Sequence, residues 1–199
     1  PGPVFFAIAK DAQTGMTEFD YKPCQFIRSY NPYPDIQPGE IEEAARLINQ
    51  SRKPFILAGQ GVVISHAEKE LSDLAEKADI PVGCTLLGLS AIPTDHPLYK
   101  GMLGMHGSIA ANIKTNECDL LIAIGMRFDD RVTGDLKQYA RQAKVIHIDI
   151  DPSEFNKNVK CDVSVLGDAR AVLQKLNEKI APAEHSEWIE SFSVCEKVE

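Results

Sequence analysis

Residues 54–61 read Pro54-Phe-Ile-Leu-Ala-Gly-Gln-Gly61, a short apolar run that ends in a glycine turn. A run of this length bounded by turn residues is typical of a strand that is buried on both faces. The same arrangement returns further on, where Leu120-Leu-Ile-Ala-Ile124 leads directly into Gly125. Strands buried on both faces occur in parallel sheets that helices cover on each side, so these two stretches decide the fold class.

Helical and strand patterns alternate along the rest of residues 39–180. Further strands are predicted at residues 80–85, 144–150 and 163–166. The predicted amphipathic helices begin after Pro38, span residues 67–78 and 108–115, and begin again after Asp168. We therefore expect an α/β domain over residues 39–180, with a doubly wound, Rossmann-like open parallel sheet, helices on both faces and right-handed crossovers.

The composition is that of an ordinary globular domain. The chain has 199 residues, of which 44% are hydrophobic and 25% charged, which is enough to enclose one core. Acidic residues outnumber basic ones by 29 to 21 and no stripe of Lys or Arg is present, which excludes nucleic acid and anionic membranes as partners. The longest apolar run is far shorter than the ~20 residues of a membrane helix. Five scattered cysteines without a Cys-x-x-Cys pair indicate a reducing compartment, so we expect a cytoplasmic protein.

The two flanks differ from this central domain. Residues 1–10 predict a stray strand without an initiator Met or a signal peptide, so the chain reads as a piece of a longer protein. Residues 11–38 contain four prolines and no sustained periodicity, which predicts an interdomain linker. Residues 181–199, with Pro182 as a break, predict a second linker that leads to a further domain.

Ligands of open parallel sheets bind outside the carboxyl ends of the strands, so the candidate residues are those that follow each predicted strand. These strand ends are Gly59-Gln60-Gly61, Thr85-Leu86, Gly125 through Val132, Asp149-Ile150-Asp151 and Gly167-Asp168. The least ordinary set follows Gly125, where two arginines and two aspartates lie within seven positions. They can fix a loop as a knot of ion pairs or bind an anion, and their place at a strand end favours the anion.

The other strand ends leave alternatives open. The turn Gly59-Gln60-Gly61 suits a diphosphate group and an ordinary turn equally well. The third glycine of the dinucleotide fingerprint would fall at Ile64 and no acid ends the next strand, which disfavours an NAD site. Asp149 can accept hydrogen bonds from a ribose or cap its own turn, and local evidence favours Asp168 as a helix N-cap.

The sequence offers no set of catalytic groups. The loop Gly101-Met-Leu-Gly-Met-His-Gly107 has glycines and soft thioethers that can lie against a flat ring. His106 has no second His at metal-ligand spacing, so we expect no metal site. No serine lies in a nucleophile elbow and no cysteine has a catalytic partner, which argues against hydrolysis by a triad.

Four motifs occur together in one order and spacing. They are Gly101-Met-Leu-Gly-Met-His-Gly107, Gly125-Met-Arg-Phe-Asp-Asp-Arg-Val-Thr-Gly134, His147-Ile-Asp-Ile-Asp151 and Val163-Ser-Val-Leu-Gly-Asp168. In this combination the chain closely resembles the central domain of the catalytic large subunit of acetolactate synthase, a family of thiamine diphosphate enzymes. The resemblance implies that residues 1–10 are the last strand of a preceding pyrimidine-binding domain and that residues 181–199 lead to a missing C-terminal domain.

The resemblance also implies an activity and its cofactors. The intact enzymes of this family condense pyruvate with a second 2-oxo acid, pyruvate or 2-oxobutyrate, in the biosynthesis of valine, leucine and isoleucine. They use thiamine diphosphate, Mg²⁺ and FAD, and the FAD lies on the central domain without a net redox role. A homo-oligomer (dimer or tetramer), a regulatory small subunit and a bacterial rather than plastid source are also implied. The family's thiamine-activating glutamate and its Mg²⁺ motif match no residue of this chain, so we expect the chain alone to be inactive.

Matching positions assign residues to the parts of FAD. The diphosphate and ribityl contacts fall on Gly59, Gln60, Gly61, Gly125, Arg127 and Asp129. The isoalloxazine ring or its approach is lined by Leu86, Leu103, Gly104, Met105, His106 and Val132, with Thr85 nearby. The adenosine end falls on Asp149, Ile150 and Asp168. Arg131 matches an arginine that binds a 2-oxo acid carboxylate at the active site of the neighbouring subunit.

Two rival hypotheses stand beside an FAD-binding domain. One is a structural spacer that keeps the fold and binds nothing, and the other is a module for a different nucleotide, ADP or NAD. The charged set of Arg127, Asp129 and Arg131 favours FAD over the spacer, because a spacer needs no such set at a strand end. The absence of the third fingerprint glycine counts against the NAD module.

Overall fold

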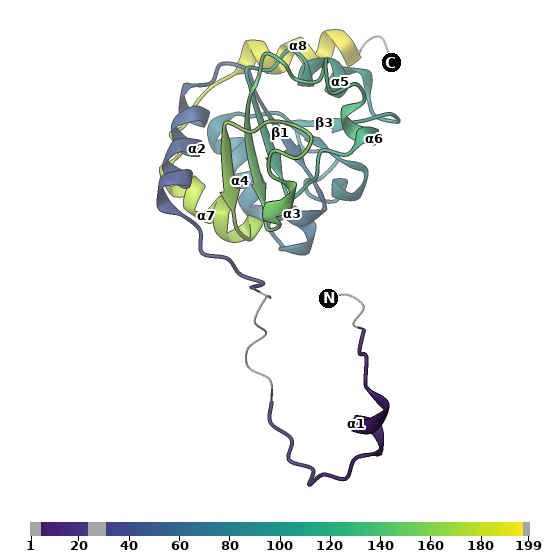
Figure 1. Ribbon diagram of the computed structural model, residues 1–199. Helices are drawn as coiled ribbons and strands as arrows, with labels where there is room; N and C mark the ends of the chain where they lie inside the picture. The colour runs from purple at the N-terminus through teal and green to yellow at the C-terminus, as the bar shows by residue number, and fades with distance from the viewer. Residues whose placement is uncertain (1–4, 24–30, 197–199) are drawn as a thin grey trace. The chain divides into compact units, whose positions relative to one another are not determined.

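A computed structural model describes residues 5–23 and 31–196, and the chain divides into two units, Pro1–Asn31 and Pro32–Glu199. The first unit contains α1 (Lys10–Thr14), at the start of the predicted linker (Figure 1). Residues 5–9 have no regular secondary structure, although the sequence predicts a strand there, and residues 1–4 lie outside the described residues. A strand forms only where its backbone is hydrogen-bonded to a neighbouring strand, and no part of residues 5–23 is paired with a strand.

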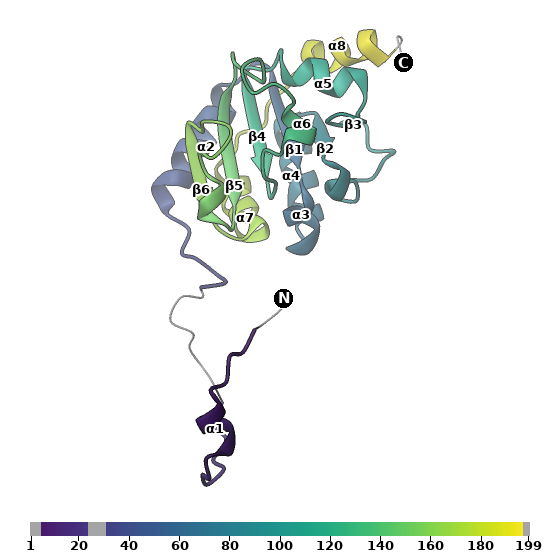
Figure 2. The ribbon, with the colours of Figure 1, turned by 45° about the vertical axis from the view of Figure 1, so that its right-hand side comes forward.

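The second unit is built on one six-stranded sheet in which every paired strand is parallel (Figure 2). The strands are β1 (Pro54–Ala58), β2 (Val82–Cys84), β3 (Tyr99–Met102), β4 (Leu120–Ile124), β5 (Lys144–Asp149) and β6 (Val163–Leu166). Their order in the sheet is β3-β2-β1-β4-β5-β6. The chain thus moves outward from β1 on one side, returns to β4, and moves outward on the other side. The predicted doubly wound, Rossmann-like open sheet is confirmed.

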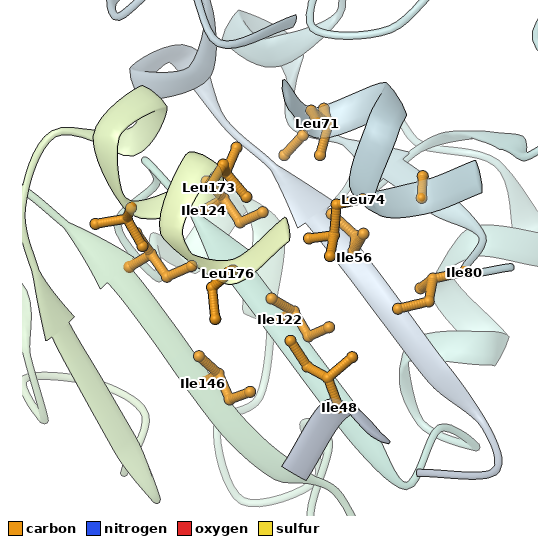
Figure 3. Close-up of a cluster of buried hydrophobic side chains, with 14 of the residues drawn as sticks. Ile48, Ile56, Leu71, Leu74, Ile80, Ile122, Ile124, Ile146, Leu173 and Leu176 are labelled. Carbon is orange, nitrogen blue, oxygen red and sulfur yellow. The ribbon is translucent and has the colours of Figure 1, made fainter. Parts of the chain in front are cut away.

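Helices cover both faces of the sheet. One face carries α2 (Pro38–Gln50), α4 (Glu68–Ala78) and α7 (Ala169–Lys179), and the other carries α5 (Ile109–Thr115) and α8 (Ser186–Glu196). Alternate residues of the central strands point to opposite faces. Ile56 and Ile122 pack with the first helix layer, whereas Phe55 and Leu121 pack with the second. Figure 3 shows the first of these two clusters, in which Leu74 of α4 lies against the strand isoleucines.

Three kinds of element are absent from the sequence prediction. The edge strand β3, with the sequence Tyr99-Lys-Gly-Met102, is half-buried throughout, so it carries no apolar run that could have revealed it. Short helices follow two strand ends: α3 (Gln60–Ile64) comes after β1, and α6 (Asp130–Thr133) comes after the loop that leaves β4. Single 3₁₀ turns occur at Leu86–Gly88 and Pro152–Glu154.

The segment predicted as the second linker contains α8, which is part of the packed core. Trp188 and Phe192 are buried, and their rings pack edge to face with centroids 5.1 Å apart. The indole Nε1–H of Trp188 donates to the carbonyl of Pro54 at 2.8 Å, which ties α8 to the start of β1. The buried ammonium of Lys114 on α5 lies 5.4 and 5.9 Å from the two ring centroids. Figures 1 and 2 both show α8 beside α5.

Phe192→Ala should lower the free energy of unfolding by about 3 to 5 kcal/mol, because it leaves a cavity next to Phe55. Urea unfolding followed by circular dichroism measures the change. Val194→Ala is the matched control, since it removes apolar atoms from an exposed position of the same helix, and its expected effect is under about 0.5 kcal/mol. Equal effects of the two substitutions would show that α8 contributes no core packing.

Candidate functional site

The candidate site lies where the strand order reverses. β1 and β4 are neighbours in the sheet, but their connections leave towards opposite edges. The two connections therefore separate at the carboxyl ends of these strands, and in open α/β sheets this is where ligands bind. Gly59-Gln60-Gly61 follows β1 at this point, and Gly125 follows β4.

The glycines at the two strand ends let the two backbones touch. A Cβ added to Gly61 would lie 2.5 Å from the Cα of Gly125, and Gly125 has a φ of +58°, which favours glycine. The N–H of Gly61 donates to the carbonyl of Gly125 at 2.8 Å, and the N–H of Gly59 donates to the carbonyl of Ile124 at 2.9 Å. Both N–H groups are thus paired within the chain. In this conformation the glycines provide a floor without side chains, not free donors for a phosphate.

A cavity of about 370 Å³ opens above this floor. It is lined by Gln60, Thr85, Leu86, Leu87, Gly125, Met126, Arg127, Asp129, Arg131 and Val132. A second cavity of about 220 Å³ adjoins it, shares Leu86, Arg131 and Val132, and adds Met102, Leu103, Met105 and His106. Leu86, Leu87 and Met105 are between 60% and 67% exposed, and all three line these adjoining cavities. Exposed apolar side chains that gather at one place are typical of a binding site.

The charged groups of the site are held by the short helix α6. Asp129 is its N-cap and accepts the N–H of Arg131 at 3.1 Å. The other carboxylate oxygen of Asp129 lies 2.8 Å from Nη2 of Arg127. The Arg131 N–H, together with the Arg127 guanidinium, holds the pKa of Asp129 below its usual range. The ion-pair knot considered from the sequence therefore exists, and both guanidinium groups remain largely exposed at the cavity.

The loop of residues 101–107 closes the second cavity. The N–H of Met105 donates to the carbonyl of Arg131 at 2.8 Å, so the loop is joined to α6. Gly104, at a φ of +108°, would place a Cβ 2.6 Å from the same carbonyl oxygen. Leu103 is buried beneath the loop, whereas Met105 and His106 are exposed on it. Two motifs about 25 residues apart in the sequence thus form one wall.

His147 supports the charged loop through the carbonyl of Met126, a role that the sequence did not predict. It is fully buried on β5, where its Nε2–H donates to the carbonyl of Met126 at 2.8 Å and its ring packs edge to face on Phe128 and Phe155. Its Nδ1 has no partner within the described residues. Burial lowers the pKa of His147 below its ordinary value of 6.5. A lone histidine inside an otherwise apolar strand is the one signal that could have revealed it.

The residues assigned to the adenosine end lie outside both cavities. Asp168 is the N-cap of α7 and accepts the N–H of Ala171 at 3.2 Å, which is the local alternative that the sequence favours. Asp149 accepts the N–H of Asp151 at 2.9 Å, and burial raises its pKa. Ile150 is about half exposed beside it. These residues follow β5 and β6, one and two strands from β4.

Two features are absent from residues 5–23 and 31–196. In that part of the chain, no group of three or more His, Cys, Asp or Glu side chains is arranged to hold a metal ion. No helix in the same ranges is long and apolar enough to cross a membrane.

A family model described as the thiamine pyrophosphate enzyme central domain matches residues 41–176. This range begins in α2, ends in α7 and includes all six strands and the cavity. The chain belongs to the thiamine pyrophosphate enzyme family. Within that family it contains the central domain, as the sequence resemblance predicts.

Similar curated proteins carry acetolactate synthase names. The chain is 46% identical to the probable acetolactate synthase large subunit of Methanocaldococcus jannaschii, with 100% of the chain and 34% of that protein covered. It is 44% identical to the acetolactate synthase large subunit of Corynebacterium glutamicum, over 96% of the chain and 31% of that protein. It is 40% identical to the acetolactate synthase large subunit of Buchnera aphidicola subsp. Schizaphis graminum, over 100% of the chain and 36% of that protein. The chain thus spans about a third of the length of these relatives.

The backbone contact at the switch point of this thiamine pyrophosphate enzyme domain can be tested with two Gly→Ala substitutions. Gly61→Ala should lower the free energy of unfolding by about 2 kcal/mol, because its Cβ meets backbone atoms that cannot move aside. Gly39→Ala is the control, since its Cβ would meet nothing within 4 Å and alanine favours the helix by up to about 1 kcal/mol. Urea unfolding measures both variants. A Gly61→Ala protein as stable as wild type would contradict the close approach.

His147 should make the stability of the domain pH-dependent. The folded state resists protonation of this buried ring, whereas in the unfolded chain the ring takes up a proton near pH 6.5. The free energy of unfolding therefore falls as the pH drops below about 6.5. His147→Gln keeps an N–H donor without titrating in this range. The difference in unfolding free energy between wild type and the variant should therefore shrink by up to about 1.4 kcal/mol per pH unit on acidification.

Urea unfolding at several values between about pH 8 and about pH 5 gives this difference directly. Asp149 and Glu154, the nearby acids, are present in both proteins, so most of their own titration cancels. A difference that stays constant over this range would show that His147 is not held neutral by its burial.

Proposed function

We propose that this domain binds FAD across the carboxyl ends of β1, β2 and β4, in a structural role without net redox change. One observation carries the proposal: Leu86, Leu87 and Met105 expose large apolar surfaces around a cavity whose rim holds two guanidinium groups. A ligand with a flat ring and an anionic diphosphate fits both the apolar and the cationic part of this site. The ring would cover the apolar side chains, and the arginines would pair with the phosphates.

The proposed orientation follows from the placement of these groups. The isoalloxazine ring would lie between Leu86, Met105 and Val132, where the two cavities join. The diphosphate would lie nearer the floor and Arg127, which would exchange part of its contact with Asp129 for the phosphates. From there the adenosine would run along the ends of β5 and β6, towards Asp149, Ile150 and Asp168.

We further propose that the whole enzyme is an acetolactate synthase of branched-chain amino acid biosynthesis, which condenses pyruvate with a second 2-oxo acid. The similarity to acetolactate synthase large subunits over the full chain supports this activity. Bound thiamine diphosphate with Mg²⁺ would supply the electron sink for the reaction. Arg131 is exposed at the cavity mouth, where its guanidinium would bind the carboxylate of a 2-oxo acid. A cytoplasmic homo-oligomer with a regulatory small subunit belongs to the same proposal.

Titration of the chain with FAD, ADP and NAD tests the cofactor. FAD should raise the melting temperature and have its fluorescence quenched, because a ligand that binds the folded state stabilises it. ADP and NAD should bind more weakly, since neither has a ring system as large as the three fused rings of isoalloxazine to cover both Leu86 and Met105. Binding of ADP or NAD in preference to FAD would instead identify a nucleotide module. Binding of none of the three would identify a spacer.

Arg127→Gln should weaken FAD binding by about tenfold or more, because it removes the charge that faces the diphosphate. Arg52→Gln is the matched control, since Arg52 is exposed just before β1, at the opposite end of the strand. Fluorescence titration gives both dissociation constants. Equal affinities of the two variants would contradict the proposed place of the diphosphate.

A further inference from the structure

We propose that Asn112, on α5, is a positioning residue for the ligand wall formed by residues 101–107 and Arg131. The inference rests on the proposed function, because it assigns a role in holding the FAD site. Asn112 contacts neither cavity and belongs to none of the motifs discussed above. Its side chain is half-buried, and both of its polar atoms are used on a single residue of the loop.

Asn112 grips both peptide groups of Gly104. Its Oδ1 accepts the N–H of Gly104 at 2.9 Å, and its Nδ2 donates to the carbonyl of Gly104 at 3.0 Å. Gly104 has a φ of +108°, a conformation that other residues rarely adopt. The pair of hydrogen bonds therefore fixes the loop at its most unusual point, because an amide that donates and accepts at once defines the orientation of the peptide groups as well as their position.

Gly104 in turn packs against the backbone of Arg131. Gly104 is so close to the Arg131 carbonyl that a Cβ would lie 2.6 Å from that oxygen, and the next N–H, of Met105, donates to it at 2.8 Å. The loop thereby holds the backbone of Arg131, while the guanidinium, whose Nε lies 3.8 Å from an oxygen of Asp130, stays exposed at the cavity. Displacement of Gly104 would therefore move Met105, on one side of the proposed ring, together with Arg131.

The helix that carries Asn112 is itself firmly anchored. Ser108 caps its N-terminus by accepting the N–H of Ala111 at 3.3 Å, and Ala111 is buried in the core. Thr115, at the other end, is buried and donates to the carbonyl of Ala111 at 2.9 Å. Asn112 thus connects an exposed loop to a rigid element, the arrangement by which supporting residues hold a binding site in its working geometry.

Asn112→Asp tests the role with little change in shape. The aspartate keeps the acceptor for the Gly104 N–H but replaces the donor by an oxygen that repels the Gly104 carbonyl. Asn116→Asp is a close control at the C-cap of the same helix: Oδ1 of Asn116 accepts the N–H of Ala140 at 2.8 Å and its Nδ2 donates to the Asn112 carbonyl at 3.3 Å. Both variants lose one donor and gain one charge, but only the first faces the ligand wall.

Three measurements on the 199-residue chain follow the two variants. Hydrogen–deuterium exchange without ligand should be about tenfold faster in Asn112→Asp for peptides that cover residues 101–107 and 130–134, and unchanged there in Asn116→Asp. The dissociation constant for FAD should rise by about tenfold in Asn112→Asp alone. The visible circular dichroism of bound flavin, measured at saturation, should change in the same variant, since it reports on the ring's surroundings.

The outcomes separate this inference from the proposed function. A wild-type chain that binds no FAD would overturn the proposed function and the positioning role with it. Wild-type binding with an equal FAD affinity and flavin signal in Asn112→Asp would overturn the positioning role alone. Unchanged hydrogen–deuterium exchange of residues 101–107 in Asn112→Asp would show that the two hydrogen bonds to Gly104 do not hold the loop, whatever the result of the FAD titration. Faster exchange with weaker, altered FAD binding supports the inference.

Discussion

Gly61 and Gly125 bring the ends of β1 and β4 so close together that no side chain fits between the two backbones. This contact joins the two halves of the doubly wound sheet at the point where the chain reverses direction. It also determines what lies above it, because the turn at Gly125 directs the following residues, Met126 and Arg127, over the end of β4. The cavity, its charged rim and its apolar side walls all depend on a floor that consists of backbone alone.

The parts of the fold that could be predicted are those with a signal in the local sequence. β1 and β4 are apolar runs buried on both faces, and the amphipathic helices α2, α4 and α7 carry a regular period. β3 has no such run because it lies at the sheet edge. α8 was missed because Pro182 and the polar residues before Trp188 are typical of a linker, and only distant residues, Pro54 and Lys114 among them, make it part of the core.

The same distinction applies to the site. Residues that line the cavity could be predicted because the carboxyl ends of parallel strands meet at one edge of the sheet. This topology places Gln60, Thr85 and Arg127 near one another. Asn112 could not be predicted, because it acts on the backbone of Gly104 and a backbone partner leaves no trace in the sequence. The place of His147 in a buried strand is a signal of its own, but its backbone partner at Met126 is equally invisible in the sequence. Of the two interpretations of the charged set, the ion pair is confirmed for Arg127 and Asp129, whereas the binding of an anion stays a prediction for an arginine that also lines the cavity.

The docking of α8 has a consequence for how the protein can be observed. Trp188 is the only tryptophan of the chain, and its indole is buried against Phe192 and hydrogen-bonded to Pro54, at the amino end of β1. The cavity lies at the other end of the same strand. Emission from this one indole therefore reports whether α8 is packed in place, whereas a flavin bound as proposed would report on the opposite end of the sheet. The chain thus carries its own fluorescent reporter of the intact fold, separated from the cavity by the length of a strand.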